Sequence, residues 1–309
     1  MTTTKTKTTH IDRTAHEPRD NSLHELLITS ITPISPTIRI VRLSPSQPQP
    51  QPSIHFFPGQ WLDLYHPPFP PSQKPGGFTI TSPPSALPYL ELAIQSSPTN
   101  PPAAYLWQEP PSSLLNTTVR VRIGGSFIYP PLQSSSLLPF KKVLFVAGGL
   151  GINPIMSMLS HIATLPPSER RAKEVAVLYG MKDPNGKIQA GDTSQALFLD
   201  RIAGLFAGDE DGLKGTVKLF LTGSGQEEHT ESLDSEKVIQ SAQGVQLPLV
   251  KRRMALPDLA GVIGEEKDEV AVYICGVPSM TDELVEELTS PSPKGLCLNE
   301  RRVLHEKWW

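Results

Sequence analysis

The segment Ala147–Pro154 has the residue types that bind a pyrophosphate. It reads Ala-Gly-Gly-Leu-Gly-Ile-Asn-Pro, follows the apolar run Lys142–Ala147 and precedes a helical pattern. Glycines let a backbone approach a phosphate closely, and the free N–H groups of a helix start favour negative charge there. Proline replaces the third glycine of the common motif, and Pro154 suits a first helical turn. We therefore expect a dinucleotide-binding turn, with a ligand-free tight turn as the alternative.

A second turn, Tyr273–Met280, follows another apolar run and reads Tyr-Ile-Cys-Gly-Val-Pro-Ser-Met. Ligands of open α/β sheets lie at the carboxyl ends of the strands. We therefore expect Cys275 and Gly276 at the same edge of the sheet as Gly149 and Gly151. Taken alone, Cys275 is better explained as a small buried apolar residue.

The second half of the chain alternates strand and helix patterns, which predicts βαβ units and a parallel sheet. The predicted strands are Lys142–Ala147, Glu174–Tyr179, Val217–Thr222 and Val270–Cys275. The predicted helices are Pro154–Leu165, Gln195–Phe206 and Ser279–Leu288. The polar segment Gly223–Gln246 is expected to form a long loop or insertion.

The first half has short strand patterns separated by turn signals, which predicts a sandwich or barrel. The predicted strands are Leu26–Ile31, Thr37–Leu43, Gln60–Tyr65, Phe78–Thr81, Tyr89–Gln95 and Thr118–Ile123. One helix is expected near Ala103–Gln108. The Pro/Gln run Ser44–Pro52 is expected to be a surface insertion in a hairpin.

Composition excludes several classes of protein. The formal net charge of −3 disfavours a nucleic-acid partner, and two cysteines make no disulfide framework. No run approaches the about 18 apolar residues of a membrane span. The eight histidines show no ligand spacing, so no metal site is expected. A reducing, intracellular location and a flexible solvated tail over residues 1–22 are the simpler expectations, although a transit peptide is an alternative for that tail.

Several segments together resemble the ferredoxin–NADP reductase superfamily, within it the oxidoreductase NAD-binding domain-containing group, over roughly residues 23–309. They are Phe57–Trp61, Gly76–Ile80, Arg122–Phe127, Gly148–Pro154, Cys275–Met280 and His305–Trp309. The resemblance implies two domains. An antiparallel Greek-key β-barrel of the FAD-binding reductase type is expected over residues 23–138, and a Rossmann-like α/β domain that binds NAD(P) over residues 139–309. It also implies a mitochondrial location.

The resemblance implies that the first domain binds FAD. In the superfamily an Arg-x-Tyr-Ser segment holds the flavin: the arginine binds the pyrophosphate, the tyrosine lies along the isoalloxazine ring and the serine lies near flavin N5. Here Gly76 replaces the arginine, Phe78 keeps the ring and Thr79 keeps the hydroxyl. The implied flavin contacts are Gly76, Gly77, Phe78, Thr79, Ile80, Ile94 and Gln95.

A second superfamily segment places a hydroxyl on the flavin phosphate at the start of a helix. Its match here, Asn100–Ala103 before Tyr105 and Leu106, has lost that hydroxyl. Without it and without the arginine, which is a bidentate phosphate clamp, pyrophosphate binding is expected to be weaker, to rely on backbone N–H groups, or to be absent.

The resemblance implies that the second domain binds a nicotinamide dinucleotide. The residues that match the pyrophosphate-binding turn are Gly148, Gly149, Gly151, Ile152, Asn153 and Pro154. Cys275 and Gly276 match the pair beside the nicotinamide, and Trp309, or Trp308, matches the C-terminal aromatic residue that stacks on flavin or is buried at a domain seam.

NADP-using members carry Ser-Arg where this chain has Thr222-Gly223, so NADH is favoured over NADPH. The cations Lys182, Arg252 and Arg253 could reach a phosphate, but plain surface charge is the preferred explanation for them.

The implied activity is hydride transfer between a nicotinamide dinucleotide and FAD, with Thr79 and Cys275 as the catalytic residues. Such chemistry belongs to the cofactors and needs little acid–base machinery from the protein. Because the chain lacks the cysteines of an iron–sulfur centre, electrons are expected to leave to a separate, unidentified acceptor. Two alternatives stay open: a non-catalytic binding or assembly protein that holds flavin weakly, and a soluble flavin reductase or diaphorase.

Overall fold

The computed structural model describes residues 9–47, 53–131, 140–183, 185–208, 211–223 and 236–308. The chain divides into two compact units, Met1–Ile128 and Tyr129–Trp309. The first unit therefore ends before the predicted domain boundary at residues 138 and 139.

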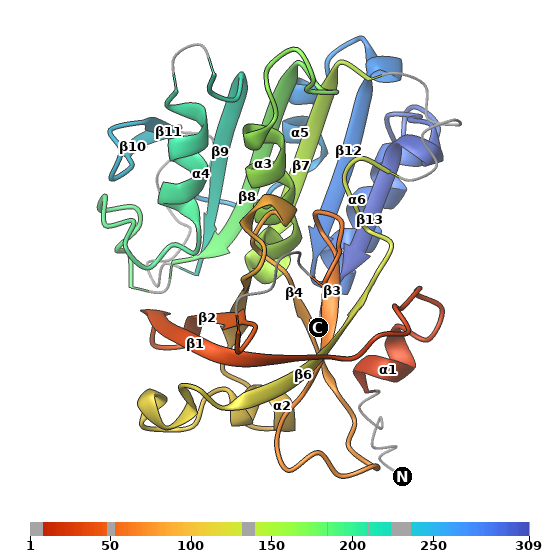
Figure 1. Ribbon diagram of the computed structural model, residues 1–309. Helices are drawn as coiled ribbons and strands as arrows, with labels where there is room; N and C mark the ends of the chain where they lie inside the picture. The colour runs from red at the N-terminus through yellow and green to blue at the C-terminus, as the bar shows by residue number, and fades with distance from the viewer. Residues whose placement is uncertain are drawn as a thin grey trace, which may run out of the picture. The chain divides into compact units, whose positions relative to one another are not determined.

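The first unit contains one antiparallel six-stranded sheet (Figure 1). Its strands are β1 (His24–Ser35), β2 (Ile38–Ser44), β3 (Trp61–Tyr65), β4 (Gly76–Thr79), β5 (Leu90–Gln95) and β6 (Thr118–Gly124). They lie in the order β4-β3-β6-β1-β2-β5. The sheet closes on itself because Ile80, just after β4, forms an antiparallel bridge with Leu92 of β5. The predicted antiparallel barrel is thus confirmed.

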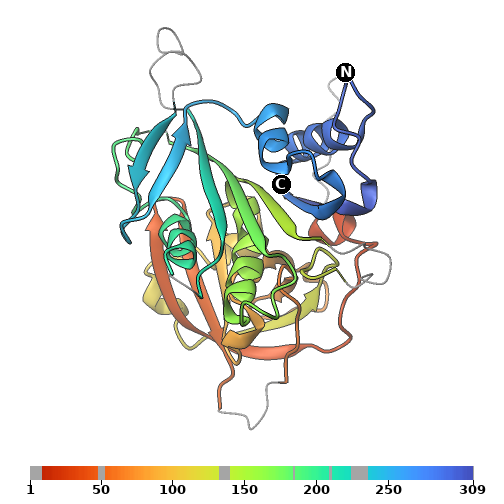
Figure 2. The same ribbon diagram turned by 90° about the horizontal axis from the view of Figure 1, so that it is seen from above.

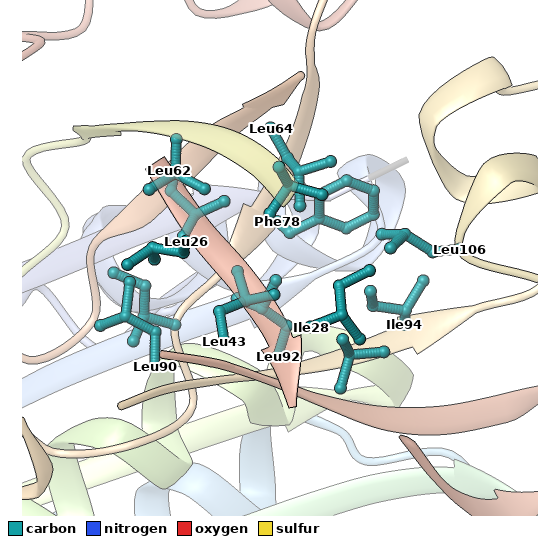
Figure 3. Close-up of a cluster of buried hydrophobic side chains, with 14 of the residues drawn as sticks. Leu26, Ile28, Leu43, Leu62, Leu64, Phe78, Leu90, Leu92, Ile94 and Leu106 are labelled. Carbon is teal, nitrogen blue, oxygen red and sulfur yellow. The ribbon is translucent and has the colours of Figure 1, made fainter. Parts of the chain in front are cut away.

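Alternate residues of these strands point into one apolar core, as the two-residue period of a strand requires. In β3 the inward side chains are Leu62 and Leu64, which stand opposite Phe78 and Gly76 of β4. Figure 3 shows this core, which also takes Leu106 from the end of helix α2 (Pro101–Tyr105). Two short 3₁₀ helices, η1 (Pro84–Ala86) and η2 (Pro111–Leu114), complete the unit.

Residues 9–22 differ from the predicted flexible tail. Thr9 caps a short helix, α1 (His10–Arg13), and Arg19 forms a bridge with Gly124 of β6. The His10 ring is buried and its Nε2 lies 3.0 Å from an oxygen of Asp63 in β3. The expectation of a tail is wrong for these residues because their anchor is a tertiary contact with a carboxylate 53 positions away. Residues 1–8 lie outside the described part of the chain.

The second unit is built on a seven-stranded sheet with the order β10-β11-β9-β8-β7-β12-β13. Its strands are β7 (Lys142–Gly148), β8 (Glu174–Lys182), β9 (Gly215–Thr222), β10 (Lys237–Gln240), β11 (Gln246–Val250), β12 (Val270–Gly276) and β13 (Val303–Lys307). All neighbours in it are parallel except β10 and β11, which are antiparallel. The predicted parallel sheet is confirmed, and its central strands are buried apolar runs, as expected of strands covered on both faces.

Helices cover both faces of this sheet (Figures 1 and 2). On one face lie α3 (Ile152–Thr164) and α4 (Leu199–Phe206), and on the other lie α5 (Leu256–Ile263) and α6 (Pro278–Thr289). Three one-turn 3₁₀ helices are also present: η3 (Gly149–Gly151), η4 (Lys267–Glu269) and η5 (Glu300–Arg302). Among the helices of the described residues, none is long and apolar enough to cross a membrane.

Two predicted insertions are only partly described. The segment Gly223–Gln246 contains strand β10 rather than loop alone, and residues 224–235 within it lie outside the described residues. Of the Pro/Gln run Ser44–Pro52, residues 48–52 lie outside them as well.

Candidate functional site

The glycine-rich turn connects β7 with α3 and leaves an open approach above Gly149. Gly149 has φ +54°, in the left-handed region that favours glycine, and no other atom lies within 4 Å of where its Cβ would stand. No side chain caps the N-terminus of α3, whose N-cap is Gly151. The first N–H groups of a helix lack intrahelical partners and attract anions. The turn therefore has an open backbone at Gly149 and no side-chain cap at the helix start, while the Ile152 N–H already donates to the Gly149 carbonyl and Pro154 has no N–H.

The other glycines of this turn are required by packing. A Cβ on Gly151 would overlap the carbonyl oxygen of Cys275, at the end of β12. A Cβ on Gly148 would stand 2.7 Å from the sulfur of Met280. Ile152, Asn153 and Pro154 are all buried behind the turn. Gly151 thus lets the start of α3 approach the backbone of β12, whereas Gly148 contacts the flexible end of the Met280 side chain.

The end of β12 carries Cys275 and Gly276, as predicted, beside β7. Cys275 is opposite Ala147 in the parallel register, and a Cβ on Gly276 would stand 3.4 Å from the Cα of Gly148. The Cys275 side chain is fully buried, and burial, with a smaller contribution from the charge of Glu306, raises the pKa of its thiol well above its usual range. The thiol is therefore neutral at physiological pH and is not a thiolate nucleophile.

Strand β13 and the residue after it bring two further side chains, Glu306 and Trp308, to the end of β12. Glu306 stands opposite Cys275 in the parallel register, and Trp308 donates its backbone N–H to the Gly276 carbonyl at 3.0 Å. The Trp308 indole Nε1 donates to a Glu306 oxygen at 2.8 Å. Trp308 is thus the aromatic residue fixed beside Gly276, whereas Trp309 lies outside the described residues. Glu306 was missed because its only signal is a register between two strands.

Thr222 lies at the end of β9, opposite Lys182 at the end of β8. The next residue, Gly223, has φ +77° and no other atom within 4 Å of a Cβ position. Asp183 is buried beside them: its N–H donates to the Thr222 carbonyl at 2.9 Å, and its carboxylate accepts the N–H groups of Ile188 and Gln189. This edge therefore combines an open glycine backbone with a buried carboxylate.

In the first unit, the predicted flavin residues divide between the barrel core and its outer face. The side chains of Phe78, Ile80 and Ile94 belong to the core and are 9%, 0% and 1% exposed. They are core residues because they share the inward face with Leu62 and Leu64, so they offer a ligand little side-chain surface. Gln95 is exposed at the end of β5.

Gly77 and Thr79 belong to the other face of β4, opposite Asp63 and Trp61 of β3. Thr79 is 4% exposed, and its hydroxyl makes no hydrogen bond to any residue that the structure describes. A Cβ on Gly77 would overlap the ring of His10. The structure thus leaves Thr79 as the one predicted flavin contact in β4 with an unused polar group, among the described residues.

Comparison with known proteins identifies the family. No protein-family model matches the chain. It is 30% identical to "Oxidoreductase NAD-binding domain-containing protein 1" of Xenopus laevis over 308 residues, which cover 98% of this chain and 85% of that protein. The chain therefore belongs to the oxidoreductase NAD-binding domain-containing protein 1 family.

Solved structures show that this family member has the two-domain fold of FAD- and NAD-binding ferredoxin reductase-like proteins. The FAD/NAD-binding domain of a nitric oxide dioxygenase from Vibrio cholerae matches with a TM-score of 0.61 at 15% identity, over 92% of this chain and 98% of that one. A ferredoxin NADP+ reductase from Neisseria gonorrhoeae, solved with FAD and NADP, matches with a TM-score of 0.59 at 16% identity, over 93% and 99% of the two chains. At these identities the likeness concerns the fold alone.

The fold implies two dinucleotides, and the residues of this family member do not fit them equally. The second unit offers an open Gly149 and an uncapped α3, as a nicotinamide dinucleotide requires. In the first unit, a Cβ on Gly76 would stand 2.8 Å from the Cβ of Pro102 and 2.9 Å from the Phe78 ring, which leaves no room for a phosphate-binding side chain. The residues present therefore fit the nicotinamide dinucleotide and do not fit the pyrophosphate half of FAD.

Proposed function

We propose that the protein is an NAD(P)H-dependent flavin oxidoreductase that uses flavin as an exchangeable oxidant and passes electrons on to a separate acceptor. The observation that carries this proposal is the uncapped start of α3 above the open Gly149, with Gly276 and Trp308 at the neighbouring strand ends. The family name and the ferredoxin reductase-like fold support the oxidoreductase class.

In this proposal the second unit binds and orients the nicotinamide dinucleotide. The turn Gly148–Gly151 holds the pyrophosphate through backbone N–H groups, and Gly276, which packs against Met280 and Gly148, lies beside it at the end of β12. The buried Cys275 thiol stays protonated, so it shapes the edge of the nicotinamide site without competing as a nucleophile. A bound nicotinamide would supply a hydride, and a bound flavin would accept it as a two-electron oxidant.

We propose NADH as the preferred hydride donor. The buried carboxylate of Asp183 adjoins Thr222, and a nearby carboxylate disfavours the 2′-phosphate of NADPH electrostatically. Arg252 is held by Asp258 through two hydrogen bonds of 2.7 and 2.9 Å, so it is not a ready phosphate ligand. The test is the ratio of kcat/KM for the two dinucleotides, and a preference for NADPH would contradict this assignment.

The experiment that tests the function follows NADH oxidation anaerobically by absorbance near 340 nm, with and without added flavin. NADH should bind in either case, and its oxidation should require a flavin. NADH binding without oxidation at any flavin concentration would refute the reductase activity while leaving the dinucleotide site in place. Absence of NADH binding would refute the assignment of the α3 turn itself.

A second candidate function is a non-catalytic binding or assembly role, which the poor fit of the FAD pyrophosphate to the first unit favours. The filled space around Gly76 supports it, because a prosthetic flavin would be held poorly there. Full-length protein that binds NADH yet never reduces flavin or an artificial dye would support this role. Mitochondrial localisation stays a prediction.

A further inference from the structure

Strand β4 is covered on both faces by side chains of this chain. On the inner face the rings of Pro102 and Phe78 fill the space at Gly76, with distances of 2.8 and 2.9 Å to a Cβ position there. On the outer face the His10 ring lies directly over Gly77. His10 is held there by its bond of 3.0 Å to the buried Asp63 and by an edge contact with Trp61. A phosphate group therefore finds no opening along these first residues of β4.

The start of α2 also lacks the donors that would bind a phosphate. Its first two positions are Pro101 and Pro102, which have no N–H group. The N–H of the N-cap residue Asn100 donates to the Ser97 carbonyl, and that of Ala104 donates to Asn100. Only the Ala103 N–H is left among the first backbone groups of this helix. A single donor is a poor anion site compared with the several that a helix start ordinarily presents.

The arginine that packs nearest to α2 does not replace the missing donors. Arg39 donates to the Leu106 carbonyl at 3.2 Å and to Glu109 at 2.6 Å, and its guanidinium lies 3.9 Å from the centre of the Trp107 ring. It is 4% exposed, so releasing it for a phosphate would break its buried hydrogen bond to Leu106 and its ion pair with the exposed Glu109. The Arg39 guanidinium is thus already bonded within the first unit and is not available to bind a phosphate.

We propose that the first unit recognises flavins through the isoalloxazine and ribityl portion that riboflavin, FMN and FAD share, and has no site for the pyrophosphate. This inference rests on the proposed function, since it assumes that flavin is the oxidant. The Thr79 hydroxyl, without a partner among the described residues, is the polar group available to that shared portion.

The test measures the dissociation constants of riboflavin, FMN and FAD for the full chain by quenching of flavin fluorescence. The three constants are expected to agree within about threefold, because the phosphates add no contact. FAD binding more than about tenfold tighter than riboflavin would overturn the inference while leaving the reductase function intact. If none of the three binds although NADH does, both this inference and the flavin part of the proposed function fail.

A variant tests whether the missing N–H donors at the start of α2 are the reason that FAD gains no affinity from its phosphates. The double change Pro101→Ala and Pro102→Ala restores two N–H donors at the helix start, and Ala keeps the Cβ of Pro102 that packs on Gly76. FAD binding should tighten by about tenfold relative to riboflavin, since hydrogen bonds to a charged group are strong. Pro111→Ala, at the first position of η2, is the matched control and should leave the ratio unchanged. An unchanged ratio in a folded double variant would overturn the assignment of the missing donors to α2.

Discussion

Gly151 and Gly149 lie two positions apart in the same turn, and the structure predicts a different physical cost for adding a methyl group to each. Gly151 has φ −59°, an ordinary helical value, so alanine causes no backbone strain there. Its Cβ, however, would overlap the Cys275 carbonyl oxygen in β12. Gly149 has φ +54°, which alanine adopts at a cost of about 1 kcal/mol, but its Cβ would meet no atom within 4 Å.

The magnitudes follow from these two geometries. Overpacking against a fixed backbone costs about 1–3 kcal/mol, and the two strands and helix around Gly151 have little freedom to move apart. Gly151→Ala should therefore lower the free energy of unfolding of the second unit by about 1–3 kcal/mol. Gly149→Ala should lower it by about 1 kcal/mol, all of it from backbone strain.

Because the chain has two units, a single global midpoint is not a sufficient measurement. Hydrogen–deuterium exchange of peptides from α3 and β12 reports the local opening, and urea unfolding reports the whole chain. Faster exchange in both elements is expected for Gly151→Ala, and a smaller increase for Gly149→Ala. Wild-type exchange in a Gly151→Ala protein would refute the close approach of α3 and β12. So would a greater loss of stability for Gly149→Ala.

Four further predictions concern binding, pH and reactivity. Gly149→Val should weaken NADH binding by tenfold or more in calorimetry while leaving flavin affinity unchanged, because only the approach to the turn is blocked. Asp63→Asn should destabilise the first unit by about 3–5 kcal/mol in urea unfolding, since it removes the partner of His10, Arg19 and Arg122. Burial raises the pKa of Asp63, but hydrogen bonds from His10 and Arg122 and the charge of Arg19 outweigh it and lower that pKa. The stability that this ionised carboxylate gives the first unit should therefore be complete above about pH 4 and lost as pH falls through the lowered pKa. A first unit whose stability does not change with pH in acid would contradict this. Iodoacetamide should alkylate the exposed Cys297 of the native protein and spare Cys275 until unfolding, which mass spectrometry of the labelled peptides can check.

The elements with strong periodicity were predicted closely from the sequence. The apolar run expected at Val270–Cys275 is β12 (Val270–Gly276), and the helix expected at Ser279–Leu288 is α6 (Pro278–Thr289). β12 is buried along its whole length and α6 buries the stripe Thr281, Leu284 and Leu288, so a local pattern carries the structure of both. The same holds for the glycine turn, whose strand, turn and helix signals are contiguous.

The elements that were missed lie at the edges of the sheet or depend on distant contacts. Strand β13 (Val303–Lys307) shows no alternation in burial because it pairs only with β12 at the edge. Strand β11 (Gln246–Val250) contains Pro248, which removes a backbone donor and weakens a strand prediction. A short window of sequence does not predict either strand, because each forms by pairing with a strand that lies far away in the sequence.

Asp63 shows how a local pattern can hide a buried polar contact on the outer face of the barrel. In Trp61–Tyr65 it alternates with Leu62 and Leu64, a pattern that predicts a carboxylate facing water. In the structure its side chain is fully buried, because Arg19 and Arg122 donate to one oxygen and His10 contacts the other.

The same contact determines what strand β4 can bind. Gly77, opposite Asp63 in the register, is the position where a side chain would displace the His10 ring. Gly76 and Gly77 therefore let side chains of this chain pack closely on both faces of β4, and they do not form an opening for a ligand. A flavin that uses this strand must reach it at Thr79, beyond both glycines, which is why the ring portion of the ligand and not its phosphates is expected to determine affinity.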